Sequence, residues 1–157
     1  SCPTKNSSWS GLMPYEKTNS EYTSSSIIDG LQMLTLKNRK HNSPYENQDW
    51  FFGTISRDEA EHLLKIYGNE QGEYLIRNSE RKFGNYSLSI RETHETMRHF
   101  RIEYQEQTAT FLIGKRSFTT LRQLIEHYHK HPIYDANPAN KLYLTKPLII
   151  HETNSQF

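Results

Sequence analysis

The stretch Glu73-Tyr74-Leu75-Ile76-Arg77-Asn78-Ser79-Glu80 predicts a strand that runs directly into a polar loop, and the rest of the chain is organised around it. A short apolar run of this kind is typical of a strand covered on both faces, and its two-residue period places Leu75 and Arg77 on one side. A guanidinium is costly to bury without a partner, and no acidic residue within the strand is placed to reach it. Arg77 is therefore either part of an ion pair with a distant carboxylate or a site for an external anion.

The composition of the 157 residues argues against several classes of function. The 19 basic and 18 acidic residues give a formal charge of +1, so no global field favours nucleic acid or an anionic membrane. The single cysteine, Cys2, excludes an internal disulfide framework and multi-cysteine zinc patterns, and it fits a reducing compartment. No run approaches the roughly 18 apolar residues of a membrane span. We expect a soluble cytoplasmic protein that needs no cofactor and no metal ion.

Composition also divides the chain at Trp50. Residues 1–49 are rich in Ser, Thr, Asn and Tyr without a sustained period, which is typical of a mostly disordered linker. Residues 50–150 carry regularly spaced aromatic and aliphatic side chains and predict one domain of about 100 residues, followed by a tail at 151–157. The chain begins with serine, so we expect it to be a piece of a longer or processed protein.

Three tyrosines of the predicted linker have polar neighbours and are interpreted as solvated: Tyr15, Tyr22 and Tyr45. The sequence Tyr45-Glu46-Asn47-Gln48 would be accessible to a tyrosine kinase. A phosphorylated Tyr45 is then a hypothetical docking site for an adaptor that recognises the asparagine two residues further on.

Local patterns predict a helix, a set of antiparallel strands and a second helix. Ser56-Arg57-Asp58-Glu59 matches a capping box, and the apolar face that follows it ends near Gly68. Residues 85–91 and 98–104 alternate between polar and apolar and join the opening strand in an antiparallel meander. Residues 120–128 begin with similar cap chemistry and carry an apolar stripe. The order indicates an α+β domain with a central antiparallel sheet flanked by two α-helices.

One face of the predicted sheet collects groups that donate hydrogen bonds. Alternation places the serines of 85–91 beside His99 and Arg101 of the next strand, on the side of Arg77. Arginine forks, hydroxyls and loop amides suit a doubly charged tetrahedral anion, so the chemistry indicates a phosphate ester. The candidate phosphate-binding side chains are Arg57, Arg77, Ser79, Ser87, His99 and Arg101.

A catalytic role for the same residues is harder to sustain. A phosphatase nucleophile is missing because the only cysteine lies in the N-terminal segment, and the glycine-rich loop and metal-binding carboxylates of a kinase do not occur. Ser87 and His99 resemble a nucleophile and base, but no carboxylate is placed to orient the histidine. His127, His129 and His131 do not converge on a metal ion, because His129 points elsewhere on a helix. We expect a binding module and not an enzyme.

The region from Trp50 to about Ile150 resembles a Src-homology-2 (SH2) domain. The motifs that carry the resemblance occur in order as Trp50-Phe51-Phe52-Gly53, Arg57, Tyr74-Leu75-Ile76-Arg77-Asn78-Ser79 and His99-Phe100-Arg101. The resemblance implies that Arg77 makes a bidentate contact to phosphotyrosine. It also implies that the other candidate side chains complete the pocket and that the loop amides around Glu80 and Arg81 add donors.

The family implies a second, more apolar site for the residues that follow the phosphotyrosine. By position, this specificity pocket is expected to be lined by Phe100, Ile113, Tyr128, Ile133 and Leu142. The segment from Ser117 to Leu144 is most similar to the Nck (Dock) adaptors, which join Src-homology-3 domains to a C-terminal SH2 domain. That similarity implies a preference for peptides with acidic residues just after the phosphotyrosine.

The function implied is a phosphotyrosine-peptide-binding adaptor module in tyrosine-kinase signalling. It would couple tyrosine-phosphorylated receptors or scaffolds to the partners of Src-homology-3 domains, as in signalling to the actin cytoskeleton. We expect a monomer that binds no nucleic acid and does not insert into a membrane. The alternative is the regulatory SH2 segment of a cytoplasmic tyrosine kinase. A third hypothesis makes the arginines purely structural and predicts that Arg77 is paired internally.

Overall fold

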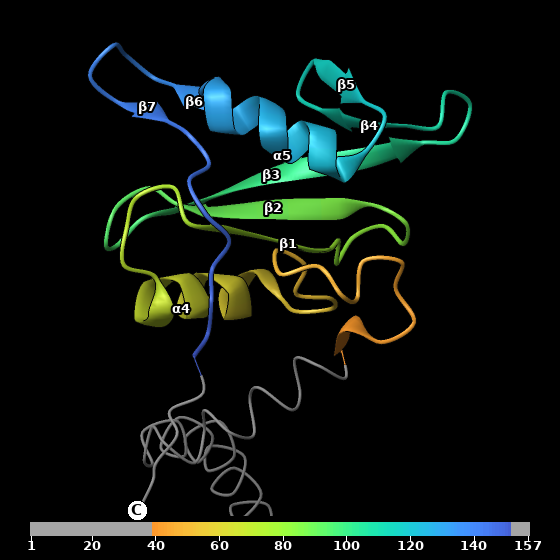
Figure 1. The fold of residues 1–157 in the computed structure, drawn as a ribbon, viewed down its shortest axis with the longest axis horizontal. Coiled ribbons are helices and arrows are strands. Elements are labelled where there is room, and N and C mark those ends of the chain that lie inside the picture. Colours follow the sequence, from red (N-terminus) through yellow and green to blue (C-terminus); the bar gives the residue numbers. More distant parts are fainter. Residues whose placement is uncertain (1–38, 152–157) are drawn as a thin grey trace, which may run out of the picture. The chain divides into compact units, whose positions relative to one another are not determined.

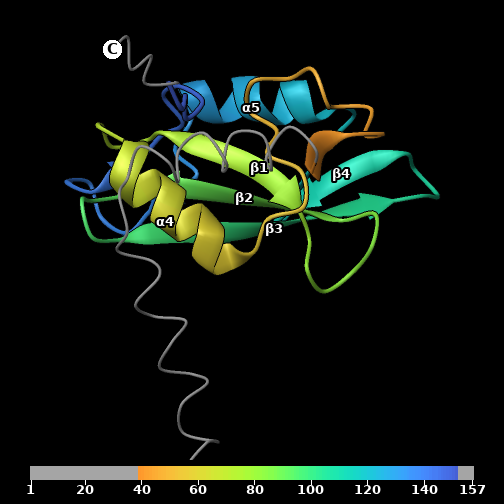
Figure 2. The same ribbon diagram turned by 90° about the horizontal axis from the view of Figure 1, so that it is seen from below.

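The computed structural model describes residues 39–151, which lie within one compact unit. A five-stranded sheet with the order β1-β2-β3-β4-β5 forms the middle layer, and helices α4 and α5 lie on its opposite faces (Figure 1, Figure 2). Every pairing in it is antiparallel. Its strands are β1 Tyr74–Asn78, β2 Tyr86–Arg91, β3 Met97–Gln105, β4 Thr110–Ile113 and β5 Arg116–Phe118. The predicted α+β architecture is confirmed.

Helix α4 spans Arg57–Tyr67 and begins as its sequence predicts. The Ser56 hydroxyl accepts from the Glu59 amide at 3.0 Å, and the Glu59 carboxylate accepts from the Ser56 amide at 2.7 Å. Each contact satisfies an amide that helical geometry leaves free. The helix buries Ala60, Leu63 and Leu64 against the sheet and ends at Gly68.

Helix α5 spans Leu121–Lys130 and is capped by Thr120, whose hydroxyl accepts from the Gln123 amide. It buries Leu121, Leu124 and Ile125 in the main core on the other face of the sheet. The chain then forms a separate two-stranded sheet from β6 (Tyr134–Asp135) and β7 (Lys141–Leu142). Neither helix of residues 39–151 is long and apolar enough to cross a membrane.

The strand β1 is buried on both faces, as its apolar run predicts. Tyr74 and Ile76 belong to the core under α5, whereas Leu75 and Arg77 alternate onto the face that α4 covers. The register pairs Arg77 with Ser87 and continues from Ser87 to Arg101, so these three residues line up across the sheet. Ser89 lies opposite His99 in the same way. The predicted neighbourhood of serines, histidine and arginine therefore exists.

The folded unit includes residues 39–49, which differs from the boundary that composition indicates at Trp50. Arg39 forms an ion pair with Glu59 of α4 at 2.7 Å, and its carbonyl accepts from the Thr54 amide at 3.3 Å. Gly53 has a φ of 69°, and a Cβ placed there would lie 2.3 Å from the Arg39 oxygen. Backbone contact this close is possible only without a side chain at residue 53. The rest of the predicted linker, residues 1–38, and the tail at 152–157 lie outside the described residues.

Tyr45 is not solvated as its polar neighbours suggest. Its half-buried ring packs on Trp50, Phe51 and Tyr86 with centroid separations of 5.4, 5.8 and 5.7 Å. Burial raises the pKa of its hydroxyl. A kinase would therefore have to detach the Tyr45 ring from this aromatic cluster, whereas Tyr15 and Tyr22 lie outside the described residues.

Candidate functional site

The candidate site is built around Arg77, whose side chain is only 4% exposed. Its Nε donates to the Ser89 hydroxyl at 3.2 Å, and its Nη1 lies 3.6 Å from the Glu80 Oε2. That second separation is too long for a hydrogen bond. Within residues 39–151 the two terminal nitrogens of Arg77 donate to no protein acceptor. Burial lowers the pKa of the guanidinium, and the charge of Glu80 opposes this shift. The group stays charged, and its fork remains open to a ligand.

One carboxylate from outside the strand lies near Arg77. Glu80 lies in the loop after β1, three residues beyond Arg77, and the chain turns back there to bring its side chain toward the arginine. The same Glu80 Oε2 accepts from the Arg57 amide at 2.9 Å. Arg57 is the first residue of α4, so this carboxylate lies at the positive end of the helix.

A series of three side chains holds Arg77 in place. The Ser89 hydroxyl lies 2.8 Å from His99 Nδ1, and His99 Nε2 lies 2.8 Å from the Glu61 Oε1 of α4. An ionised carboxylate only accepts, so Nε2 carries the ring proton and Nδ1 accepts from Ser89. The Ser89 oxygen then accepts from Arg77, and the chain of hydrogen bonds has one consistent direction.

The charge state of His99 agrees with the direction of this hydrogen-bond chain. Burial lowers the pKa of its imidazole, with the Arg57 and Arg77 charges acting in the same sense and Glu61 opposing them. Burial works to raise the pKa of Glu61, but hydrogen bonds from His99 and Arg57 outweigh it and hold that pKa below its usual value. A neutral His99 and an ionised Glu61 are therefore the favoured pair. Both ring nitrogens are engaged, so His99 positions Ser89 and Arg77.

The loop after β1 is ordered by Ser79. Its hydroxyl accepts from the Arg81 and Lys82 amides at 3.2 and 3.3 Å, and its own amide donates to the Asn85 carbonyl at 2.9 Å. Of the amides expected to act as ligand donors, that of Arg81 thus donates to Ser79 in this structure. At the loop tip the Phe83 side chain is fully exposed.

The remaining candidate arginines lie at the rim. Arg57 has a side chain that is 62% exposed and pairs with Glu61 at 3.3 Å. Arg101 is similarly exposed and pairs with Glu103, also at 3.3 Å. Ser87 lies between Arg77 and Arg101 in the sheet register. The structure thus brings the candidate phosphate-binding residues to the face of the sheet beside the start of α4.

Two members of this network, Ser89 and Glu61, were not among the candidate residues, although the sequence did place Ser89 on this face. Ser89 shares the alternation of Ser87, which was sufficient to place it on the same face. Glu61 follows Arg57 by four residues, a spacing at which helical side chains are neighbours. Its contact with His99 joins the helix to the third strand and depends on the tertiary packing.

A serine, a histidine and a carboxylate do meet here, but as Ser89, His99 and Glu61 and not through Ser87. A carboxylate therefore does orient the histidine, contrary to the expectation from the sequence. Ser89 is fully buried and its oxygen accepts from Arg77, so a substrate has no approach to it in this structure. The three groups form a structural hydrogen-bond chain.

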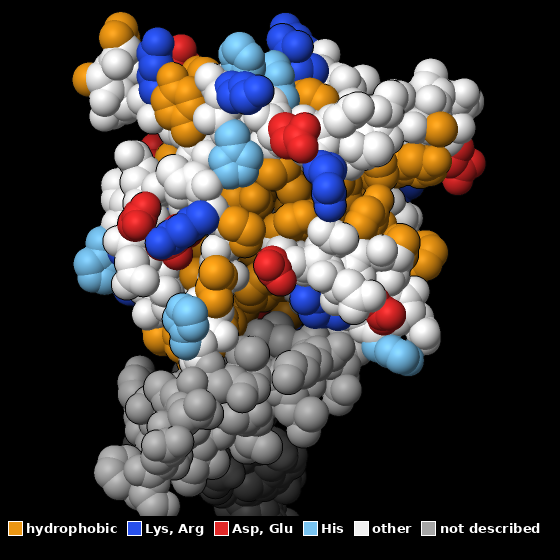
Figure 3. Space-filling view, viewed as in Figure 1, with side chains coloured by type: hydrophobic (Ala, Val, Ile, Leu, Met, Phe, Trp, Pro, Cys, Tyr) orange, Lys and Arg blue, Asp and Glu red, His pale blue; other side chains and the backbone are white. Residues whose placement is uncertain are grey.

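The residues expected to line a specificity pocket divide into two groups. Ile113 and Leu142 are 4% and 1% exposed and belong to the core. Phe100, Tyr128 and Ile133 are partly buried and pack against that core, so they are the members that reach the surface. Figure 3 shows one face of the molecule, on which acidic and basic side chains are interspersed.

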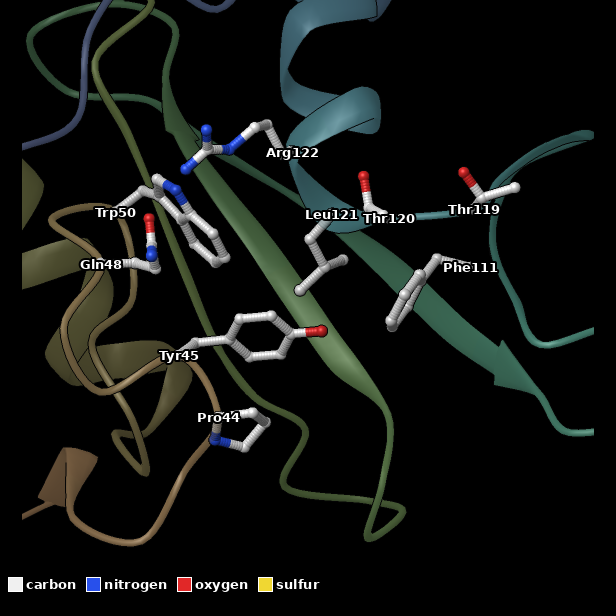
Figure 4. Close-up of a pocket in the computed structure, with 9 residues that line it drawn as sticks. All are labelled: Pro44, Tyr45, Gln48, Trp50, Phe111, Thr119, Thr120, Leu121 and Arg122. Atoms are coloured by element: carbon white, nitrogen blue, oxygen red, sulfur yellow. The ribbon is translucent and has the colours of Figure 1, made fainter.

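Two hollows formed by the described residues are not lined by Arg77. A hollow of roughly 360 Å³ lies between residues 44–50 and the start of α5, and the Tyr45 ring reaches across it toward Leu121 and Phe111 (Figure 4). A second hollow, of roughly 580 Å³, lies between residues 39–44 and the loop after β1. Neither is lined by Arg77, although Ser79, Glu80 and Arg81 of the loop after β1 line the second.

The histidines of α5 form no metal centre that the structure reveals. His127 and His131 stack with their ring centroids 4.4 Å apart. Within residues 39–151 no group of three or more His, Cys, Asp or Glu side chains is arranged to hold a metal ion.

Comparison with known proteins gives matches over the same region. The sequence model of the SH2 domain family matches residues 50–128. The SH2/SH3 adapter protein dreadlocks of Drosophila melanogaster is 36% identical over 101 residues, which cover 64% of this chain and 18% of that protein. The chain therefore spans about a fifth of the length of this curated relative. A solution NMR structure of the SH2 domain of the Monosiga brevicollis CRK/CRKL homolog (crka1) matches with a TM-score of 0.57 at 25% identity, covering 69% of this chain and 94% of that one.

Proposed function

Because the chain belongs to the SH2 domain family, we propose that residues 39–151 bind phosphotyrosine peptides, with the phosphate received by the terminal nitrogens of Arg77. One observation carries this proposal. The Arg77 guanidinium is buried and charged, yet its terminal nitrogens donate to no acceptor within the described residues. A phosphate ester brings about −1.5 to −2 charges and several strong acceptor oxygens, whereas an unmodified tyrosine brings neither.

The depth of Arg77 favours a phosphate carried on a long side chain. With 4% of its side chain exposed, the guanidinium is reached only by a group that projects inward past the rim. The rim arginines Arg57 and Arg101 and the hydroxyl of Ser87 then complete the contacts. The neutral His99 acts indirectly, because it holds the hydroxyl of Ser89 that fixes Arg77.

The residues after the phosphotyrosine would lie on the surface formed by Phe100, Tyr128 and Ile133. We propose peptides with acidic residues directly after the phosphotyrosine, since the rim carries exposed arginines. The module would act as an adaptor in the cytoplasm and couple tyrosine-phosphorylated proteins to partners of other domains. This role is supported by the similarity to the SH2/SH3 adapter dreadlocks.

Calorimetry tests the proposal with a peptide that carries one phosphotyrosine followed by acidic residues, and with its unphosphorylated form. Wild-type chain should bind only the phosphorylated peptide. Arg77→Met keeps an apolar stem and removes the fork, and it should weaken binding by about 2–5 kcal/mol, as when one partner of a desolvated charge pair is removed.

The matched control is Arg91→Met, because Arg91 is also a buried arginine of this sheet. The folded Arg91→Met variant should bind the phosphorylated peptide with an affinity within a factor of about three of the wild-type value. A tenfold change would correspond to roughly 1.4 kcal/mol, so this difference is smaller than that. Unchanged binding in Arg77→Met would instead favour the hypothesis that the arginines are structural.

A further inference from the structure

Each arginine of the candidate site has a carboxylate of its own chain beside it. Arg57 pairs with Glu61, Arg101 pairs with Glu103, and Arg77 lies near Glu80. The first two pairs lie on the surface and connect residues of the same element. The third differs, because Glu80 reaches from a loop toward a guanidinium that is almost entirely buried.

Glu80 also lies between two sources of positive potential in the site. Its Oε2 accepts from the Arg57 amide at 2.9 Å and faces Arg77 Nη1 at 3.6 Å. The first contact is at the N-terminal end of α4, where free amides and the helix dipole favour an anion. One oxygen of the Glu80 carboxylate therefore lies where an oxygen of a bound phosphate would meet the same donors.

We propose that Glu80 is an internal competitor for the phosphate, which occupies the site in the free protein and leaves it when phosphotyrosine binds. This inference rests on the proposed function and adds a regulatory element to the same site. A ligand would bind by exchange, with the phosphate taking over Arg77 and the Glu80 side chain moving out into solvent.

The geometry favours replacement of the Glu80 carboxylate by the phosphate at Arg77. The Glu80 side chain is 52% exposed, and its separation from Arg77 is too long for a hydrogen bond. It carries one charge, whereas the phosphate carries more charge and matches the arginine fork with two oxygens. Anions with a single charge gain less from the exchange, so Glu80 would select against carboxylates and other weak competitors.

The test uses Glu80→Gln in the full chain. Glutamine has the same size and can still accept from the Arg57 amide, but it lacks the charge that competes for Arg77. Titration with phenyl phosphate and with the phosphotyrosine peptide should show binding roughly two- to fivefold tighter than in wild type, as expected for the loss of a partly exposed ion pair.

The matched control is Glu106→Gln, which changes the net charge equally at an exposed position in the turn between β3 and β4. It should leave both affinities unchanged at the same ionic strength. Tightening in Glu80→Gln alone supports the inference. Equal tightening in both variants, or no tightening in Glu80→Gln, overturns it.

The two levels of the proposal fail in different ways. If wild type binds the phosphopeptide and Arg77→Met does not, while Glu80→Gln binds no tighter than wild type, the competitor role is excluded and the binding function stands. If wild type does not bind the phosphopeptide, the proposed function fails, and the inference fails with it.

Discussion

Two buried arginines on one face of the sheet, Arg77 and Arg91, have opposite environments. Both lie under α4, Arg77 on β1 and Arg91 on β2, and the two residues are 3% and 7% exposed. Arg91 Nη1 donates to the carbonyls of Leu64 and Lys65 at 2.9 and 3.4 Å, near the end of the helix. Arg77 lies toward the start of that helix, where its terminal nitrogens make no hydrogen bond within residues 39–151 and its Nη1 lies 3.6 Å from the Glu80 Oε2.

The helix explains why the two arginines differ in role. Its C-terminal end presents free carbonyls and a negative potential, which stabilise a cation such as Arg91. Its N-terminal end presents amides and a positive potential, which disfavour a second cation and favour an anion. Burial alone therefore does not identify a binding arginine, whereas the acceptors around its terminal nitrogens do.

The largest effect on stability is expected from the structural arginine. Arg91→Met removes charge-assisted hydrogen bonds to the end of α4 and should lower the free energy of unfolding by about 1.5–3 kcal/mol. Chemical denaturation measures the change. Arg77→Met is the comparison and should cost less stability, because the terminal nitrogens of Arg77 make no internal hydrogen bond and only the contact of Nε with Ser89 is lost. Equal losses would erase the distinction between the two arginines.

A smaller loss is expected when the support of Arg77 is removed. Ser89→Ala leaves Arg77 Nε and His99 Nδ1 without their shared partner in a buried position, so the free energy of unfolding should fall by about 1–2 kcal/mol. Phosphopeptide affinity should fall as well, because Arg77 is no longer held in one orientation. Denaturation and calorimetry on the same samples measure both, and a variant with full affinity would show that Arg77 needs no positioning by Ser89.

The smallest effect concerns pH. Burial lowers the pKa of His99, so its contribution to stability is complete above the unfolded value of about 6.5 and is lost as the pH falls toward the folded pKa. The groups that face it are Ser89, Glu61, Arg57 and Arg77. The free energy of unfolding should therefore decrease as the pH falls below about 6.5. His99→Gln should reduce this decrease, and an unchanged slope in that variant would assign it to other groups.

Much of the fold could be predicted because its signals are local. The capping box at Ser56, the alternation from Tyr86 to Arg91 and the stripe of α5 each depend on residues close in sequence. The start of the domain could not be predicted in this way. Residues 39–49 are polar in composition, and only tertiary contacts such as those of Arg39 and Tyr45 include them in the folded unit.

The hydrogen-bond donors of the site could be predicted from the sequence, but the carboxylates that accept from them could not. Alternation alone places Ser87, His99 and Arg101 on the face of Arg77, as the register confirms. Glu61 was missed and Glu80 was expected only for its backbone amide, because the contacts of both carboxylates depend on where the helix and the loop pack. Strand alternation likewise could not distinguish the buried Ile113 from the surface Phe100, since burial there depends on α5 and the segment that follows it.

Nuclear magnetic resonance of isotope-labelled arginine side chains tests the role of Arg77 most directly. On titration of the whole chain with the phosphotyrosine peptide, the terminal nitrogen signals of Arg77 should shift and their rotation should slow, because phosphate oxygens then hold both ends of the fork. The Arg91 signals should stay in place, since that guanidinium already has its acceptors. Saturating peptide that leaves the Arg77 signals unmoved, or that shifts those of Arg91 equally, would contradict the assignment of Arg77 as the phosphate-binding arginine.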